Sequence, residues 1–220
     1  MSGGQSDGGT APENEVRALR AKLPSAVLDV TEHLGHTYLS VPKAMIAEAL
    51  LALRDGEPGY RMLSECLCVD YLDVTSGELL GGRSARFEVV YNLVSLGSEP
   101  GLTPATARRL FVKVAVPETD AVVPTVTGVH PGAAFPEREI YDMFGIRFEG
   151  HPDLRRLLMS DDWIGHPQRK DYPLGGERVQ FPGGTYGPSV GERVVRHPGE
   201  GFFGATAGVT EPPTHVSGDR

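Results

Sequence analysis

Carboxylates, histidines and arginines, the side chains that most often carry acid–base and metal chemistry, crowd into residues 137–174. Among Glu137, Glu139 and Asp142, the last two would take neighbouring positions on one helical turn, as an acid–base pair requires. Arg138 lies among them, however, and a guanidinium stabilises the ionised form of a nearby carboxylate. Such carboxylates are poor general acids and good structural ion pairs, so we predict no catalytic residue here.

A metal site is the second chemistry that this stretch suggests. His151, His166, Asp161 and Asp162 have the residue types of metal ligands, but their spacing fits no compact ligand set. Histidines beside prolines more often hydrogen-bond to a backbone carbonyl or a carboxylate. We therefore predict no metal site, and a free-standing metal-dependent hydrolase that uses these four residues stays open as an alternative.

Cysteine and glycine patterns bear on redox chemistry. The chain has two cysteines, Cys66 and Cys68, which would share one face of a predicted strand. Iron–sulfur clusters and structural zinc usually need four ligands, so we interpret the pair as buried, apolar thiols. No strand–GxGxxG–helix or GxxxxGK[ST] pattern occurs, which argues against a nicotinamide or flavin site. We predict no cofactor on this chain.

Composition narrows the class of partner. The chain has 220 residues and a formal net charge of −8, from 21 basic and 29 acidic side chains, which argues against nucleic acid and anionic lipid. The most apolar stretch, residues 44–53, is about half the ~20 residues that a membrane-spanning helix needs. The first residues lack the pattern of a secretion signal, so we expect a cytoplasmic chain.

Hydrophobic periodicity predicts the elements that position this chemistry. Residues 13–22 form an amphipathic helix, and a second helix follows Pro42, with an apolar stripe from Met45 to Leu53. Strands are expected at residues 27–32, 36–41, 61–74, 84–96 and 108–116, with a hairpin turn at Gly35. In the fourth of these strands, Phe87, Val89, Tyr91 and Leu93 alternate with Arg86, Glu88 and Asn92, which indicates one covered face.

These elements predict an α+β fold, a two-layer domain whose mostly antiparallel sheet is covered on one face by helices. A short helix should run from Pro136 to Phe144. We divide the chain into four parts: a disordered start (residues 1–12), the α+β domain (13–130), a segment that docks on partner subunits (131–176) and a Gly/Pro-rich extension (177–220).

The charged stretch cannot enter a core without pairing its polar groups one by one. We therefore interpret it as an extended segment held against another surface by specific ion pairs. It begins with an acidic-basic-acidic triplet (Glu137-Arg138-Glu139), followed by an acid (Asp142) and two apolar residues (Met143-Phe144). A histidine (His151), a basic residue (Arg155) and an apolar pair (Leu157-Leu158) complete the pattern. This pattern, and the block at residues 161–174, resemble the 30-kDa subunit family of respiratory complex I, the bacterial NADH:quinone oxidoreductase. The family usually has tryptophans where His130 and Phe135 stand here.

The resemblance implies a non-redox subunit of the peripheral arm, at the cytoplasmic face of the cell membrane. It implies as partners the subunit that holds the quinone site and the neighbouring iron–sulfur subunits, with FMN and the clusters carried by other subunits. A homologous subunit of a related membrane-bound hydrogenase, or of a dehydrogenase with another electron donor, is the alternative within the resemblance. The residues expected to carry the docking are Glu137, Arg138, Glu139, Asp142, Phe144, His151, Asp153, Arg155, Asp161, Asp162, Trp163, His166, Arg169, Asp171 and Tyr172.

Overall fold

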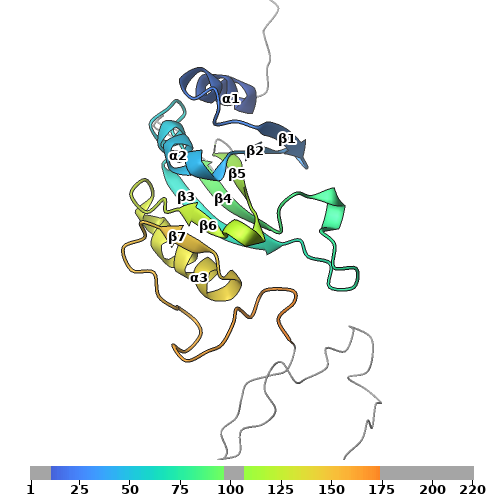
Figure 1. The fold of residues 1–220 in the computed structure, drawn as a ribbon. Helices are drawn as coiled ribbons and strands as arrows, with labels where there is room; N and C mark the ends of the chain where they lie inside the picture. The colour runs from blue at the N-terminus through green and yellow to red at the C-terminus, as the bar shows by residue number, and fades with distance from the viewer. Residues whose placement is uncertain (1–10, 97–106, 174–220) are drawn as a thin grey trace, which may run out of the picture. The chain divides into compact units, whose positions relative to one another are not determined.

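A computed structural model describes residues 11–96 and 107–173 of the chain (Figure 1). The predicted disordered start, residues 1–12, lies outside this part except for its last two residues, which begin the first helix. The predicted extension at residues 177–220 lies wholly outside it. The described residues up to Tyr172 belong to one compact unit.

The centre of this unit is a five-stranded sheet with the strand order β1-β2-β5-β4-β3. Neighbouring strands are antiparallel except β2 and β5, which are parallel. The prediction of a mostly antiparallel sheet is therefore confirmed. The strands are β1 Asp29–His33, β2 His36–Ser40, β3 Met62–Asp70, β4 Phe87–Ser95 and β5 Arg108–Val116.

The predicted hairpin joins β1 and β2 through a two-residue turn. Leu34 and Gly35 both have positive φ, 50° and 76°, as a tight turn between twisted antiparallel strands requires. Glycine adopts this conformation without the steric cost that a Cβ atom imposes. The turn sets the register in which His33 pairs with His36.

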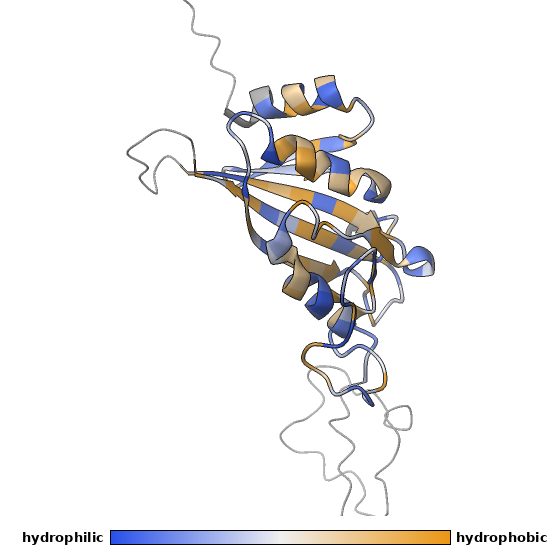
Figure 2. Ribbon diagram, turned by 90° about the vertical axis from the view of Figure 1, so that its left-hand side faces the viewer, coloured by the Kyte–Doolittle hydropathy of each residue, from blue (hydrophilic) through white to orange (hydrophobic). Residues whose placement is uncertain are grey.

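Helices cover one face of the sheet. They are α1 Ala11–Lys22, α2 Ile46–Arg54 and α3 Ala134–Phe144, and short 3-10 turns at Lys43–Met45 and Pro131–Ala133 lead into α2 and α3. Apolar and polar residues alternate along parts of the strands, as the bands of hydropathy in Figure 2 show. On β5 the buried Leu110, Val112 and Val114 alternate with Arg109, Phe111 and Lys113, which are exposed or half-buried. The predicted two-layer α+β fold is confirmed.

The core lies between the sheet and these helices. Ile46, Leu50 and the covered face of β4 belong to a single buried apolar cluster. At one end of that cluster, the ring of Phe144 on α3 meets the ring of Phe87 edge-on, with centroids 6.4 Å apart. The short helix predicted before Phe144 therefore belongs to the core, and it begins two residues earlier than predicted.

Two short strands were not predicted. β6, Val122–Pro124, and β7, Arg147–Glu149, pair in parallel as a separate two-stranded sheet. Three residues are too few to show the period-two alternation that identifies longer strands. Further 3-10 turns lie at Leu80–Gly82 and Glu118–Asp120. In the described part of the chain, no helix is long and apolar enough to span a membrane.

Candidate functional site

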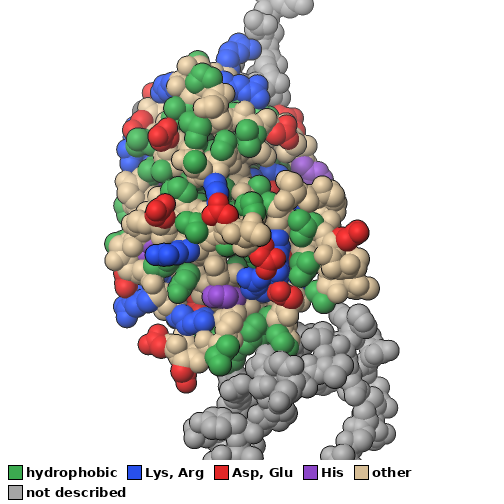
Figure 3. Space-filling view, viewed as in Figure 1, with side chains coloured by type: hydrophobic (Ala, Val, Ile, Leu, Met, Phe, Trp, Pro, Cys, Tyr) green, Lys and Arg blue, Asp and Glu red, His purple; other side chains and the backbone are tan. Residues whose placement is uncertain are grey.

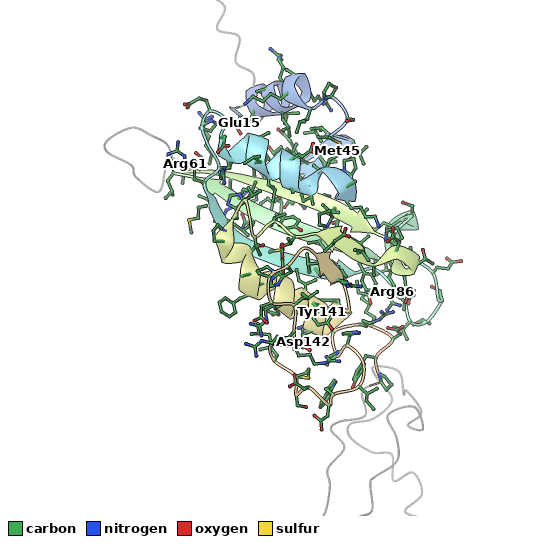
Figure 4. All side chains as sticks on the ribbon, turned by 60° about the vertical axis from the view of Figure 1, so that its left-hand side comes forward. Glu15, Met45, Arg61, Arg86, Tyr141 and Asp142 are labelled. Atoms are coloured by element: carbon green, nitrogen blue, oxygen red, sulfur yellow. The ribbon has the colours of Figure 1, made fainter. Side chains whose placement is uncertain are left out.

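The candidate site is the segment that follows β7 and runs along α3. We call residues 151–172 the strap; it has turns but no helix or strand. The strap starts after the turn that ends β7, passes the last turn of α3 and ends beside Arg86, the residue before β4 (Figure 4). Its contacts with α3 and with the sheet form separate clusters.

The end of α3 is shaped to receive the strap. Gly145 stops the helix in the left-handed conformation, with φ 79°, and its N–H donates to the carbonyl of Tyr141 at 3.0 Å. A Cβ atom at Gly145 would lie 2.7 Å from the ring of His166. Glycine is therefore required here both by the backbone and by the close approach of the strap.

The strap also supplies donors that the helix lacks at its end. The last carbonyls of a helix have no partner within the helix. The N–H of Gln168 donates to the carbonyl of Met143 at 3.0 Å, and Nδ1–H of His166 donates to the carbonyl of Asp142 at 2.9 Å. The strap thus acts as the C-terminal cap of α3.

Asp142 is the centre of the first cluster. Its side chain is fully buried, and Oδ1 accepts a hydrogen bond from Arg156 Nη1 at 2.6 Å. Oδ2 accepts three consecutive backbone N–H groups, from Leu157, Leu158 and Met159, at 3.0, 2.7 and 2.9 Å. Burial by itself would raise the pKa of Asp142, but these donors outweigh it and hold the pKa below its ordinary value. The carboxylate is therefore ionised and fixes the strap to the helix.

Two arginines extend this cluster through backbone carbonyls. Nη2 of Arg156 donates to the carbonyls of Trp163 and Gly165, each at 3.0 Å. Arg138, on α3, donates to the carbonyls of Arg155 and of Arg156 at 3.2 and 3.0 Å. Because an irregular segment has few backbone partners of its own, these guanidinium groups replace the hydrogen bonds of secondary structure.

The second cluster holds the end of the strap against the sheet. Arg86 is buried and binds the carboxylate of Asp70 with two hydrogen bonds, at 2.8 and 3.1 Å. The same guanidinium donates to Glu118 at 2.7 Å and to Asp171 at 2.5 Å. The N–H of Lys170 donates to Asp70 at 2.9 Å. Burial by itself would lower the pKa of Arg86, but the carboxylates outweigh it and raise the pKa.

The alternation in the sequence predicted Arg86, Glu88 and Asn92 on the uncovered side of their strand. The structure corrects this, because all three side chains are buried. Arg86 precedes the first residue of β4, so it is not bound to the alternation, and Asp70 and the strap cover it. Arg169 joins it on the ring of Phe87, where the two guanidinium carbons lie 5.3 and 4.9 Å from the ring centroid. Arg169 also pairs with Glu118.

Glu137 occupies a third, different environment at the start of α3. Its side chain is fully buried, with Oε2 accepting from Thr125 Oγ1 at 2.5 Å and Oε1 from the N–H of Val126 at 2.8 Å. Among the described residues no arginine or lysine pairs with it, and Nε2 of His151 lies 3.9 Å from its Oε2. Burial therefore raises the pKa of Glu137, and the two hydrogen bonds only partly oppose the rise.

The histidines of the metal hypothesis are engaged in hydrogen bonds. Nε2 of His151 lies 3.0 Å from the carbonyl of Ala134, and Nδ1 accepts the N–H of Asp153 at 3.0 Å. A carbonyl only accepts, so Nε2 carries the hydrogen and neither nitrogen offers a free lone pair. Nδ1 of His166 is engaged with Asp142. Within residues 11–96 and 107–173, no group of three or more His, Cys, Asp or Glu side chains could hold a metal ion.

The two cysteines lie on β3. Cys66 is buried and Cys68 is half-buried, and both are free thiols. Burial raises the pKa of both groups, so they remain protonated and unreactive at neutral pH.

The predicted docking residues are distributed between the interior and the surface. Those that are buried are Glu137, Asp142 and Phe144. Those that are half-buried are Arg138, His151, Trp163, His166, Arg169 and Tyr172. Those that are exposed are Glu139, Asp153, Arg155, Asp161, Asp162 and Asp171.

Four residues that fix the strap were not predicted as part of the site. They are Asp70, Arg86, Glu118 and Arg156. Arg156 lies inside the pattern and could have been chosen on the same grounds as Arg155. Asp70 ends one strand and Arg86 precedes the next, so an antiparallel register would have placed the acid beside the base. Nothing in the sequence near Glu118 indicates its partner 51 residues later.

The sequence that forms this site matches a known protein family. Residues 39–178 match the model of the family described as the 30 Kd subunit of respiratory-chain NADH dehydrogenase. The match spans more than half of the chain and includes α3, β7 and the entire strap. The chain belongs to this family. The predicted resemblance is thereby confirmed.

Individual relatives in the 30-kDa family are similar over most of their length. A subunit of the NADH-quinone oxidoreductase of Roseiflexus sp. (strain RS-1) is 44% identical over 164 residues, which are 74% of this chain and 84% of that protein. Subunit 5 of the NADH-quinone oxidoreductase of Thermus thermophilus is 43% identical over 153 residues, 70% of this chain and 69% of that protein.

A solved structure extends the similarity to another complex. A chain of the membrane-bound sulfane sulfur reductase, described as an archaeal respiratory membrane complex, is similar with a TM-score of 0.55 and 25% identity. The similarity covers 74% of this chain and 86% of that chain. A chain similar to this one thus occurs in a respiratory membrane complex that is named for another activity.

Proposed function

We propose that this chain is a non-redox subunit of the peripheral arm of proton-translocating NADH:quinone oxidoreductase. The observation that carries the proposal is its family membership, with relatives named as subunits of that enzyme at 43% and 44% identity. The chain would then take part in NADH oxidation only as a component of the complex. FMN and the iron–sulfur clusters would be carried by other subunits.

The role that we propose is positional. Electron transfer between centres depends on fixed distances, so a subunit without centres contributes by holding its neighbours in register. The strap suits this role because its polar groups are anchored one by one to α3 and to the sheet. A segment that is ordered before binding loses little conformational entropy when a partner covers it.

The docking surface that we propose consists of the strap and the adjoining part of α3. Its buried members, Glu137, Asp142 and Phe144, would act by holding the segment in place, because partners cannot reach them in this conformation. Its exposed members, such as Asp153, Arg155 and Asp161, would contact the subunit that holds the quinone site and the neighbouring iron–sulfur subunits. The complex would lie at the cytoplasmic face of the membrane, with this chain as a peripheral member.

Purification of the tagged chain from membranes of the source organism tests the proposal. We expect the subunits that carry FMN, the iron–sulfur clusters and the quinone site to co-purify, together with NADH:quinone oxidoreductase activity. We expect the chain purified alone to be colourless, free of metal and inactive. A wild-type chain that is recovered from cells without these subunits would contradict the proposal.

The similarity to the sulfane sulfur reductase favours one alternative, a homologous subunit in a membrane-bound complex with a different electron donor. The two relatives described above have a higher identity and are named for NADH and quinone, which supports the first proposal. The same purification separates the two, since the co-purifying subunits and the electron donor oxidised by the complex would differ.

A further inference from the structure

The part of the strap between its anchors to α3 exposes apolar side chains. We call residues 157–164 the strap tip. Leu158 and Ile164 are 58% and 71% exposed, and Trp163 is half-buried between them in sequence. Single exposed apolar residues are common on protein surfaces. Two large ones on one eight-residue loop, next to a half-buried tryptophan, are the composition of an interface anchor.

Hydrogen bonds from Asp142 and Arg156 to the backbone of the tip keep these side chains exposed. Asp142 fixes the beginning of the tip through the backbone N–H groups of Leu157, Leu158 and Met159. Arg156 fixes the other end through the carbonyl of Trp163. With its backbone held at both ends, the tip cannot fold its apolar side chains inward, and it is preorganised for a partner.

The charged side chains of the tip are all acidic. Its only charged side chains are Asp161 and Asp162, and both are exposed. Within the part of the chain that the structure describes, neither forms an ion pair. The other acids of the strap differ in this respect, since Asp153 pairs with Arg155 at 3.0 Å and Asp171 with Arg86 at 2.5 Å.

We propose that the strap tip inserts Leu158 and Ile164 into an apolar pocket on a partner subunit, rimmed by lysine or arginine side chains that face Asp161 and Asp162. This inference rests on the proposed function and adds the chemistry of the partner surface. An apolar anchor with oppositely charged groups around it gives both affinity and orientation, and the ring of charges keeps water from the anchor. In Figure 3, hydrophobic and acidic side chains lie side by side in the lower part of the described unit, where α3 and the strap lie.

The test uses membranes that contain the assembled complex with a tagged chain. The fraction of the chain that stays with the complex is measured during washes of increasing salt concentration. We expect the double reversal D161K/D162K to lower the retained fraction at least tenfold, and D161N/D162N to lower the salt concentration that releases the chain. The variant L158S/I164S should be released more readily at every salt concentration while the salt dependence stays that of the wild type.

The control carries the same change of charge on another exposed element. D29K/E32K, on β1, should be retained as the wild type is, because it alters two exposed acids far along the chain from the strap. If D161K/D162K is retained like the control, or more tightly than the wild type, the partner surface is not basic and the inference is wrong. A wild-type chain that is absent from the complex would instead contradict the proposed function, so the two failures are distinguishable.

Discussion

Glu137 and Asp142 lie five residues apart on α3, and both side chains are fully buried, yet the pKa values of their carboxyl groups shift in opposite directions. Asp142 has four hydrogen-bond donors, one of them a guanidinium, and its pKa is lowered. Glu137 has two neutral donors and its pKa is raised. Both carboxyl groups are shielded from solvent, but Glu137 lies deeper in the protein than Asp142. The depth of burial and the number and charge of the donors therefore both distinguish the two groups.

The difference also assigns the two residues separate tasks. Asp142 joins the helix to a segment without secondary structure, so its ionised form is part of the fold. Glu137 joins α3 to residues 125 and 126, where its hydrogen bonds need an acceptor but no charge. The comparison can be tested by substitutions that remove charge from each site, beginning with the largest expected effect.

Asp142→Ala should be the most damaging of these substitutions. It leaves the mostly buried Arg156 without its carboxylate and three N–H groups without an acceptor, which should lower the free energy of unfolding by about 3–5 kcal/mol. The penalty should shrink as the pH falls below about 4, because a carboxyl group with a lowered pKa stabilises the fold only while it is ionised. Urea unfolding at several pH values measures both effects.

The exposed Asp153 provides the control for Asp142, since its nearer partner, at 3.0 Å, is the exposed Arg155. Its other partner, Arg138 at 3.7 Å, keeps its hydrogen bonds to the strap carbonyls without it. Asp153→Ala should change the free energy of unfolding by less than about 1 kcal/mol. An Asp142→Ala variant as stable as Asp153→Ala would show that the cluster around Asp142 does not hold the strap.

Arg86→Gln should have the next largest effect, because it strands the buried carboxylate of Asp70 and releases the end of the strap. We expect a loss of about 3 kcal/mol, together with faster proteolytic cleavage near Asp171. Arg155→Gln, at a guanidinium that is 71% exposed, is the matched control and should cost less than about 1 kcal/mol. Equal losses for the two variants would argue against a second anchor.

Gly145→Ala should have a moderate effect. The left-handed backbone at this residue costs a non-glycine side chain about 1–2 kcal/mol, and the new methyl group would meet the ring of His166. Gly132→Ala is the control, because a Cβ atom there meets nothing within 4 Å. If both variants unfold at the same urea concentration, the close approach of the strap to α3 does not contribute to stability.

Glu137→Gln should have the smallest effect, less than about 1 kcal/mol at pH 7, since an amide can accept from the N–H of Val126 and donate to the hydroxyl of Thr125. A group with a raised pKa stabilises the fold fully below its unfolded pKa of about 4.3 and loses that contribution as the pH rises through the folded pKa. The variant should therefore gain stability relative to the wild type between about pH 4 and pH 7. A loss as large as that of Asp142→Ala would overturn the comparison.

Much of the fold follows from local patterns in the sequence. The period-two alternation in β4 and β5 and the apolar stripe of α2 each repeat over enough residues to be recognised. The hairpin before His36 and the helix end before Gly145 depend on single glycines with positive φ. By contrast, β6 and β7 have three residues each, and the parallel pairing of β2 with β5 depends on the whole topology.

The candidate site was predictable in its location but not in its partners. The charged pattern identified the segment, yet no local pattern indicates the approach of Asp70 to Lys170, which are 100 residues apart and joined by one hydrogen bond. Individual acids also looked alike in the sequence. Only the folded chain separates Asp142, with its guanidinium and three N–H groups, from Asp161, which is exposed.

The role of the strap in assembly can be measured in membranes from cells whose only copy of this chain carries Asp142→Ala. Membranes that carry Glu48→Ala, at an exposed acid on α2, are the control. We expect Asp142→Ala to lower the amount of assembled complex and the NADH:quinone oxidoreductase activity in parallel, while Glu48→Ala preserves both. Wild-type amounts of active complex with Asp142→Ala would contradict the proposal that the strap, held by its own domain, supports the assembly.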